Sequence, residues 1–219
     1  MKKEQIAHRI QEIGIIPAVR VTSAQDALFA AEAVSRGGIP IVEVTMTVAG
    51  ALEVISELAG MDPDLIVGAG TVFDVHDARR CLDAGARFLT TPGLDVEIVS
   101  YAVQHATIVF PGVLTPTEVM LASRAGSDFV KVFPCSQVGG ASYIKALKSP
   151  FPNVPLIASG GVNQQTAADF IRAGAVAIGI GQSLIPHEAI RQRQSDRIRE
   201  LAHRFVDIVK HARKEGEPH

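Results

Sequence analysis

Short apolar runs alternate with segments of helical pattern along the whole chain. The runs are rich in Val and Ile, as expected for strands of a parallel sheet that are buried on both faces. They cover residues 15–20, 40–45, 64–70, 87–93, 107–113, 128–134, 154–161 and 176–181. Their regular alternation with helical segments predicts a series of βα units.

Helix start and stop signals fall between these runs. Ser23 and Asp26 are spaced as a capping box that opens a helix over 24–36, and Gly37 can end it. Thr115 and Glu118 repeat the spacing, with a proline at the first helical position. Three further glycines follow Ala-rich helical segments and precede strands, which indicates αβ loops: Gly85, Gly126 and Gly174.

The first 14 residues predict a helix that precedes the first strand. Ile6, Ile10 and Ile13 lie on one side of it, and the segment lacks the apolar core of a signal peptide. With the eight runs that follow, the pattern predicts an α/β fold, a (β/α)8 TIM barrel with an N-terminal helix, in which residues 1–219 form a single domain. An open doubly wound sheet is the alternative, but glycine ends almost every strand, which suits a ring of short loops better.

The composition excludes several classes of protein. The chain is 47% hydrophobic and 20% charged, with a formal net charge of −2 and no basic block, so nucleic acid is not expected to be a partner. No apolar run is long enough to span a bilayer, so no membrane role is expected. Two cysteines do not make a disulfide framework, which favours a cytoplasmic protein.

Two charged residues interrupt predicted strands. In the run 128–133, Phe129, Lys131 and Phe133 share one face because successive strand residues alternate. Glu43 shares a face with Thr45 in the same way. Since the valines on the opposite faces would pack against helices, we expect Lys131 and Glu43 to point into the barrel, where such enzymes carry their chemistry at the carboxyl ends of strands.

A buried lysine and glutamate are costly unless they are paired or used in chemistry. Apolar surroundings favour the neutral form of an amine, which attacks carbonyl carbons, and the protonated form of a carboxyl, which makes its carboxylate an effective base. Lys131 is therefore a candidate nucleophile and Glu43 a candidate general base. The alternatives are a structural ion pair between them, or an edge strand with Lys131 in water.

Glycine-rich loops follow the last two strands. Ser159, Gly160 and Gly161 end the seventh run, and Gly181 and Ser183 end the eighth. Adjacent glycines let backbone N–H groups converge on an anion, and barrels often bind phosphate with these two loops. The two loops together predict a phosphate site.

A metal or another cofactor is not expected. None of the histidines lies at a predicted strand end, and a solvated surface position is the simpler interpretation of each. They are His8, His76, His105, His187, His203, His211 and His219. Cys135 lacks a neighbouring histidine and is expected to pack rather than react. Phe73 and the other aromatic residues are expected to fill the core.

Seven short motifs together resemble a known family, the 2-dehydro-3-deoxy-phosphogluconate (KDPG) and 4-hydroxy-2-oxoglutarate (KHG) aldolases. The likeness extends from about Ile15 to Arg213. In chain order the motifs are EVT at 43–45, GAGT at 68–71, PG at 92–93, PGV at 111–113, TPTE at 115–118, KVFP at 131–134 and GGV at 160–162.

The resemblance implies a class I aldolase, an aldehyde-lyase that cleaves KDPG to pyruvate and glyceraldehyde 3-phosphate without a metal, as a homotrimer. The family's Schiff-base lysine falls on Lys131 and its acid/base glutamate on Glu43. The remaining expected substrate-binding residues come from the matched motifs and the strand ends: Arg20, Thr45, Thr71, Pro92, Phe133, Ser159, Gly160, Gly161, Gly181 and Ser183.

Two positions depart from the family's pattern. Many members carry an Arg two residues after the EVT threonine, where this chain has Thr47, so Arg20 would have to supply the positive charge for the substrate carboxylate. The loop after the seventh strand is usually Thr-Gly-Gly, and here Ser159 begins it, which leaves the stereochemical preference open.

Four alternatives to KDPG cleavage remain at this point. The same chemistry would serve KHG or 2-dehydro-3-deoxy-6-phosphogalactonate. A different barrel enzyme, such as a phosphate-binding isomerase or decarboxylase, would need another catalytic set. A non-catalytic trimeric scaffold would bind a sugar phosphate without turnover.

Overall fold

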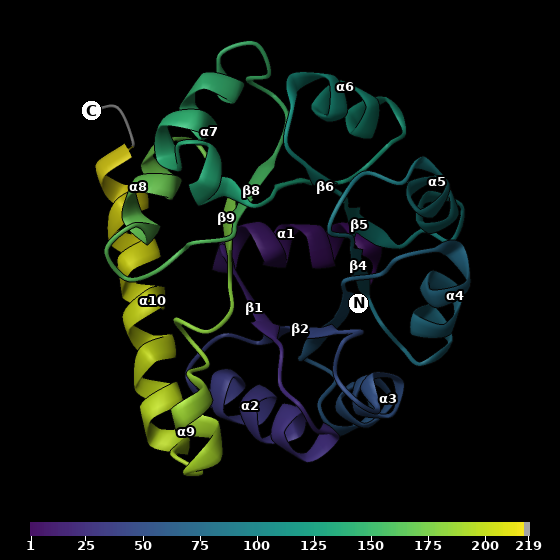
Figure 1. Ribbon diagram of the computed structural model, residues 1–219, viewed down its shortest axis with the longest axis vertical. Helices are drawn as coiled ribbons and strands as arrows, with labels where there is room; N and C mark the ends of the chain where they lie inside the picture. The colour runs from purple at the N-terminus through teal and green to yellow at the C-terminus, as the bar shows by residue number, and fades with distance from the viewer. Residues whose placement is uncertain (217–219) are drawn as a thin grey trace.

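The computed structural model describes residues 1–216, which form an α/β fold with helices outside a ring of strands (Figure 1). The strands are β1 (Ile15–Val19), β2 (Ile41–Thr45), β3 (Ile66–Gly70), β4 (Phe88–Thr90), β5 (Ile108–Phe110), β6 (Gly112–Val113), β7 (Val130–Val132), β8 (Leu156–Ser159) and β9 (Ala177–Ile180). The helices are α1 (Lys3–Ile13), α2 (Ala24–Arg36), α3 (Ala51–Met61), α4 (Val75–Asp83), α5 (Val96–Gln104), α6 (Pro116–Arg124), the 3-10 helix η1 (Cys135–Val138), α7 (Ala141–Lys148), α8 (Ala167–Arg172), α9 (His187–Arg191) and α10 (Ser195–Gly216). None of the helices within 1–216 is both long and apolar enough to cross a membrane.

All nine strands belong to one parallel, nearly closed sheet in the order β5-β4-β3-β2-β1-β9-β8-β7-β6. The two ends of this order, β5 and β6, are separated only by Pro111. The run expected as one strand over 107–113 is therefore observed as two, at a proline that has no N–H to donate. Backbone N–H groups of the β7 segment donate to the carbonyls of Val109, Pro111 and Val113, which brings both halves of the run against β7.

The predicted starts of α2 and α6 are observed, but only α6 has the complete capping box. The Ser23 hydroxyl accepts from the amide of Asp26, but the Asp26 carboxylate pairs with Arg193 at 2.9 Å instead of completing a capping box. At α6 the box between Thr115 and Glu118 is complete. The Glu118 carboxylate accepts from the two amides preceding the helix, and these hydrogen bonds lower the pKa of Glu118.

The first and last helices are tied together at the amino-terminal end of the strands. In α1, Ile6 and Ile10 are buried as predicted, and the helix lies across the middle of the ring in Figure 1. α10 packs along α8 and α2. From α10, the Arg213 guanidinium donates to the carbonyls of Gln11 and Glu12 at the end of α1 and, at 2.9 Å, to that of Val176, just before β9. One side chain thus joins the chain's two end helices to the last strand.

Three buried phenylalanines form an aromatic layer from neighbouring strands. The rings of Phe88 and Phe110 stack with centroids 5.0 Å apart, and Phe110 meets Phe129 edge-on at 5.9 Å. Phe73 was expected in the core as well, and this prediction is wrong, because 77% of its surface is exposed. It lies between β3 and α4, in a loop where the alternation that buries strand residues does not apply.

Candidate active site

Lys131 lies in β7, half-buried, beyond the Phe88–Phe110–Phe129 layer toward the carboxyl end of the strands. Its Nζ atom donates a hydrogen bond of 3.0 Å to Oγ1 of Thr90, and it lies 5.5 Å from the centre of the Phe133 ring. The amine therefore has a neutral hydroxyl and an aromatic face as neighbours.

Glu43 lies in β2 and is only 4% exposed. Gly70, near the end of β3, makes room for it, since a Cβ there would come within 2.0 Å of the Glu43 Oε1 atom. Among residues 1–216, the carboxylate makes no hydrogen bond and no ion pair, with Lys131 or any other group. The alternative of a structural Lys–Glu pair is therefore wrong for this structure, and the carboxylate is left available to a ligand.

Thr45 shares the inward face of β2, but its hydroxyl is engaged. The side chain is fully buried, donates to the Val19 carbonyl at 3.1 Å and lies 2.8 Å from the Thr47 hydroxyl. Thr47, where the resemblance leads one to expect arginine, is thus part of a short hydroxyl chain that ends at the β1 backbone.

Arg20 and Thr71 meet near the mouth of the barrel, where the Arg20 Nη2 atom lies 3.4 Å from the Thr71 hydroxyl. Thr71 has a φ of +58°, a region that a β-branched residue rarely occupies, so the backbone is strained here. Arg20 is exposed and makes no ion pair with any of residues 1–216. Its positive charge is therefore not neutralised by the described part of the chain.

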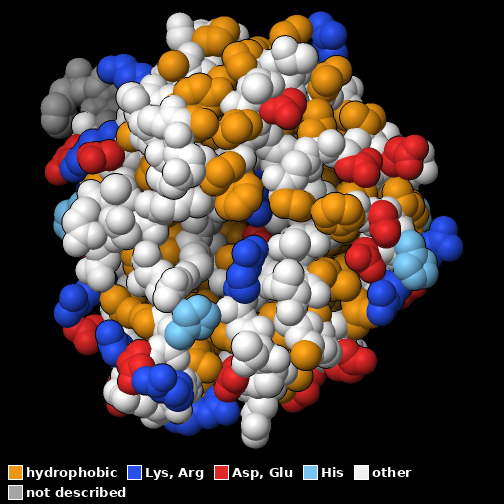
Figure 2. Space-filling model, in the orientation of Figure 1, with side chains coloured by type: hydrophobic (Ala, Val, Ile, Leu, Met, Phe, Trp, Pro, Cys, Tyr) orange, Lys and Arg blue, Asp and Glu red, His pale blue; other side chains and the backbone are white. Residues whose placement is uncertain are grey.

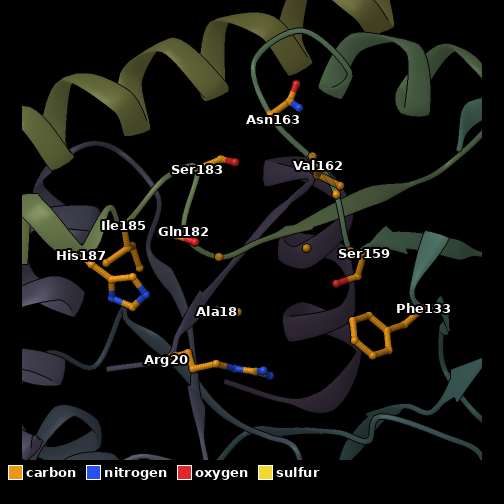
Figure 3. A pocket seen from close by; sticks show the side chains of 14 residues that line it. Ala18, Arg20, Phe133, Ser159, Val162, Asn163, Gln182, Ser183, Ile185 and His187 are labelled. Atoms are coloured by element: carbon orange, nitrogen blue, oxygen red, sulfur yellow. The ribbon is translucent and has the colours of Figure 1, made fainter. Parts of the chain in front are cut away.

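A pocket of about 410 Å³ opens on the β1, β8 and β9 side of the ring. Figure 3 shows Arg20 extending into it toward Phe133 and Ser159, with His187 on the opposite wall. The face that it opens on is hollowed at its centre, where Lys or Arg atoms lie (Figure 2). Seven of the expected site residues line the pocket: Arg20, Phe133, Ser159, Gly160, Gly161, Gly181 and Ser183.

The loops after β8 and β9 present unpaired amide groups. Within residues 1–216, the N–H groups of Gly161, Val162, Gln182 and Ser183 have no acceptor. Gly160 and Gly161 have φ values of +87° and +82°, which L side chains rarely adopt. Several unpaired amides around one pocket can donate hydrogen bonds to a bound anion.

The loop after β8 leans on the segment after β7. The amide of Ser136 donates to the Gly160 carbonyl at 3.1 Å, and a Cβ on Gly161 would come within 2.1 Å of the Ser136 hydroxyl oxygen. Gly161 is therefore required for its close contact as well as for its backbone conformation.

The other expected site residues lie outside the lining of this pocket: Glu43, Thr45, Thr71, Pro92 and Lys131. Arg20 and Phe133 link the two groups, because both line the pocket while Arg20 contacts Thr71 and Phe133 lies beside Lys131. The predicted site is thus one continuous region with two parts.

Sequence reasoning missed several residues of the pocket. Ala18 faces it from β1, Ile185 and the exposed His187 from the segment after β9, and Asn163 and Gln182 from the two glycine loops. His187 was correctly expected at the surface, but not beside the substrate pocket. Their common signal is position, since four of them follow within eight residues of a predicted strand end.

A comparison with protein families identifies the chain. The model described as KDPG and KHG aldolase matches residues 6–201. The chain belongs to the KDPG and KHG aldolase family. A 2-dehydro-3-deoxy-phosphogluconate aldolase of Pseudomonas aeruginosa is 32% identical over 214 residues, which cover 96% of this chain and 97% of that protein.

Solved structures of KDPG aldolases agree with this family membership. The enzyme of Legionella pneumophila, with pyruvate captured as a covalent carbinolamine intermediate, has a TM-score of 0.84 at 30% identity over 90% of this chain and 96% of its own. The enzyme of Zymomonas mobilis, with 3-phosphoglycerate, has a TM-score of 0.84 at 28% identity over 93% of this chain and 96% of its own.

Proposed function

We propose that this aldolase cleaves KDPG to pyruvate and glyceraldehyde 3-phosphate through a Schiff base on Lys131. The observation that carries the proposal is the arrangement of two unlike features at one end of the barrel. An amine free of any ion pair within residues 1–216 lies on β7, and a pocket rich in unpaired amides lies on β8 and β9. A 2-oxo acid with a distal phosphate needs the amine to react with its carbonyl carbon and the amides to bind its phosphate.

The reaction begins at the Lys131 amine. Nζ attacks the C2 carbonyl carbon and gives a carbinolamine, which loses the C2 oxygen as water and becomes a protonated iminium. Burial of the amine beside the Phe133 ring, without a carboxylate partner, supports its role as the nucleophile.

Glu43 serves as the base and then as the acid. Its carboxylate takes the proton of the C4 hydroxyl, the C3–C4 bond breaks, and the electron pair enters the iminium to form an enamine while glyceraldehyde 3-phosphate leaves. Glu43 returns the proton to C3, and water then hydrolyses the iminium to release pyruvate. The free carboxylate over Gly70 supports this assignment.

Substrate binding is assigned to the surrounding residues. Arg20 and Thr71 hold the C1 carboxylate, with Arg20 in place of the arginine that Thr47 replaces. Pro92, Phe133 and Thr45 shape and support the pyruvyl end. The phosphate lies on the two loops formed by Ser159, Gly160, Gly161, Gly181 and Ser183, whose unpaired amides support this placement.

Reductive trapping tests the nucleophile. Incubation with pyruvate and borohydride should add one reduced pyruvyl group to Lys131, located by peptide mass spectrometry, because borohydride reduces an iminium irreversibly. Lys131→Ala should not be labelled, while Lys145→Ala, which removes an exposed lysine on α7, should be labelled like the wild type. Equal labelling of Lys131→Ala would refute the assignment.

A panel of substrates tests the specificity. We expect the highest kcat/KM with KDPG, because the unpaired amides of the β8 and β9 loops suit a phosphate. KHG ends in a carboxylate and is shorter, and the galactonate epimer differs in the C4 hydroxyl that Glu43 must reach. A higher kcat/KM with either of them would reassign the substrate while retaining the mechanism.

We further propose that residues 1–219 act as one (β/α)8 domain, with β5 and β6 as two halves of a single strand. Only Pro111 separates them, and carbonyls from both halves accept hydrogen bonds from the β7 segment, which supports this count of eight.

A homotrimer is supported by an exposed apolar patch on the α4–α6 side. Apolar side chains gather on this side of the face in Figure 2. The large exposed apolar side chains of this side, here called the patch, are Phe73 (77% exposed), Val96, Val103, Met120 and Leu121. Such a set on a monomer would be a liability in water, and burial against a second copy removes it.

Sedimentation tests the trimer. The wild type should sediment with the mass of three chains, and the double variant Phe73→Ser, Leu121→Glu should shift toward the mass of one. Met61→Ser, which changes an exposed methionine on α3 outside the patch, serves as the control. A monomeric wild type, or a double variant that remains trimeric, would contradict this interface.

A further inference from the structure

A buried threonine contacts the amine that is proposed to react. Thr90 ends β4 with no exposed surface, and its Oγ1 atom accepts the 3.0 Å hydrogen bond from Lys131 Nζ. Within residues 1–216 this is the one hydrogen bond that the amine makes. Thr90 belongs to none of the groups assigned above to the substrate carboxylate, the phosphate or the acid/base step.

The sheet explains how two distant residues meet. After β4 the ring continues through β5 and β6 to β7, so Thr90 and Lys131 are not on adjacent strands. Gly112, the β6 residue paired with Lys131, lies against the backbone that follows Thr90, since a Cβ there would come within 2.3 Å of the Pro92 carbonyl oxygen. Thr90 shares the face of β4 with Phe88, so the contact lies above the buried aromatic layer and away from bulk water.

The chemistry of the amine suits a hydroxyl acceptor. The free amine, the carbinolamine, the protonated iminium and the enamine each keep at least one N–H on Nζ. Thr90 Oγ1 can therefore accept a hydrogen bond in every state of the reaction. Unlike a carboxylate, the hydroxyl carries no charge, so this contact is not an ion pair.

We propose that Thr90 is a positioning residue for the Schiff-base nitrogen, an inference that rests on the proposed function of Lys131. With one N–H directed to Thr90, the C2 atom of the substrate is held on the opposite side of Nζ, toward the open end of the barrel. The hydrogen bond becomes charge-assisted when the protonated iminium forms, so it favours formation of the iminium from the amine and the C2 carbonyl.

Two substitutions separate the hydroxyl from the shape of the side chain. Thr90→Val keeps the volume and β-branching and removes the acceptor, and Thr90→Ser keeps the acceptor. We expect Thr90→Val to lower kcat by roughly 10- to 100-fold, the range for one hydrogen bond to a charged group, with KM changed less than about threefold. Thr90→Ser should recover kcat to within about threefold of the wild type.

Borohydride trapping with pyruvate supplies a second measurement. Because the iminium forms more slowly without a positioned amine, the labelling rate of Thr90→Val should fall along with kcat. Ser127→Ala is the matched control, since it removes a buried hydroxyl, in the loop before β7, that has no hydrogen-bond partner among residues 1–216. Its kcat and labelling rate should equal those of the wild type, and circular dichroism should show all three variants folded.

The outcomes distinguish this inference from the proposed function. Wild-type kcat in Thr90→Val, with the label still on Lys131, would overturn the inference alone. A loss of kcat that Thr90→Ser does not recover would also overturn it, by assigning the effect to packing. If pyruvate and borohydride labelled the wild-type protein on a residue other than Lys131, the proposed function and the inference would both be overturned.

Discussion

The two parts of the site present different kinds of chemical groups. Toward β2, β4 and β7 the barrel offers side chains: the carboxylate of Glu43, the hydroxyl of Thr90 and the amine of Lys131. Toward β8 and β9 it offers mainly the backbone, with amides at Gly161 and Ser183 that have no acceptor in the described part of the chain. Bond breaking requires groups that gain and lose protons, whereas an anion needs only convergent donors.

This difference predicts how each part responds to substitution. Removing a reactive side chain should lower kcat, because the transition state loses a group that it needs. Disturbing the backbone part should raise KM, because the proposed contacts of the loops with the distal phosphate are made in the ground state as well as in the transition state.

The largest effect is expected on the side-chain part. Lys131→Ala should lower kcat by about 10⁴-fold or more, since no other group can form the iminium. Pyruvate release at saturating substrate measures it, with Lys145→Ala as the control. Residual activity within tenfold of the wild type would place the nucleophile elsewhere.

Glu43→Gln should lower kcat by roughly 10²- to 10⁴-fold, the contribution of general acid–base catalysis. The amide fits the space over Gly70 but cannot take up the C4 proton. Peptide mass spectrometry should still find the pyruvyl label on Lys131, since the nucleophile is intact. A variant that turns over KDPG at the normal rate would remove Glu43 from the mechanism.

Gly161→Ala should act on binding instead. The added Cβ meets the Ser136 hydroxyl, and φ is +82°, so the loop must shift. We expect KM for KDPG to rise at least about tenfold with kcat changed much less. Turnover of 2-dehydro-3-deoxygluconate, which lacks the phosphate, should be unaffected.

Gly60→Ala is the matched glycine control. Gly60 lies within α3, and nothing lies within 4 Å of a Cβ added there, so KM and kcat should remain those of the wild type. If Gly161→Ala lowered kcat instead of raising KM, the division between the two parts of the site would be wrong.

The smallest effect at neutral pH is expected at the thiols. Burial raises the pKa of Cys135 to about 11 and that of Cys81 to about 12, so both should resist Ellman's reagent at pH 8 until the protein is unfolded. In the unfolded chain thiols ionise at about pH 8.5, while in the folded chain they remain protonated. The free energy of unfolding should therefore fall as the pH rises from about 8.5 toward 11. Urea titrations at pH 7.5 and 10 measure this fall in the free energy of unfolding. Rapid labelling of the native protein by Ellman's reagent would contradict the raised pKa values.

The sequence was sufficient to predict the groups that stand out by type. All eight apolar runs contain a strand, and strand alternation favoured an inward Lys131 and Glu43. The glycine-rich loops could also be predicted, because a pair such as Gly160-Gly161 indicates a backbone conformation that residues with a side chain rarely adopt.

Contacts that depend on the closed ring could not be predicted. Thr90 is one of many strand threonines, and its contact with a residue 41 positions away follows from the curvature of the sheet. Phe73 was misassigned because it lies in the loop between β3 and α4, where strand alternation does not bury a side chain. Pro111 has no N–H and interrupts the sheet ladder, but the apolar residues on both sides of it have the pattern of one continuous strand.

The Arg213 hydrogen bonds have a consequence for the order in which contacts form during synthesis of the chain. The ribosome makes α1 first and α10 last, yet a single guanidinium in α10 holds the carbonyls at the end of α1 beside β9. During synthesis α1 therefore lacks its hydrogen bonds to α10 until Arg213 has emerged from the ribosome. A nascent chain that stalls before residue 213 has all nine described strands, Lys131 and Glu43, but cannot make these hydrogen bonds between α10, α1 and the segment before β9.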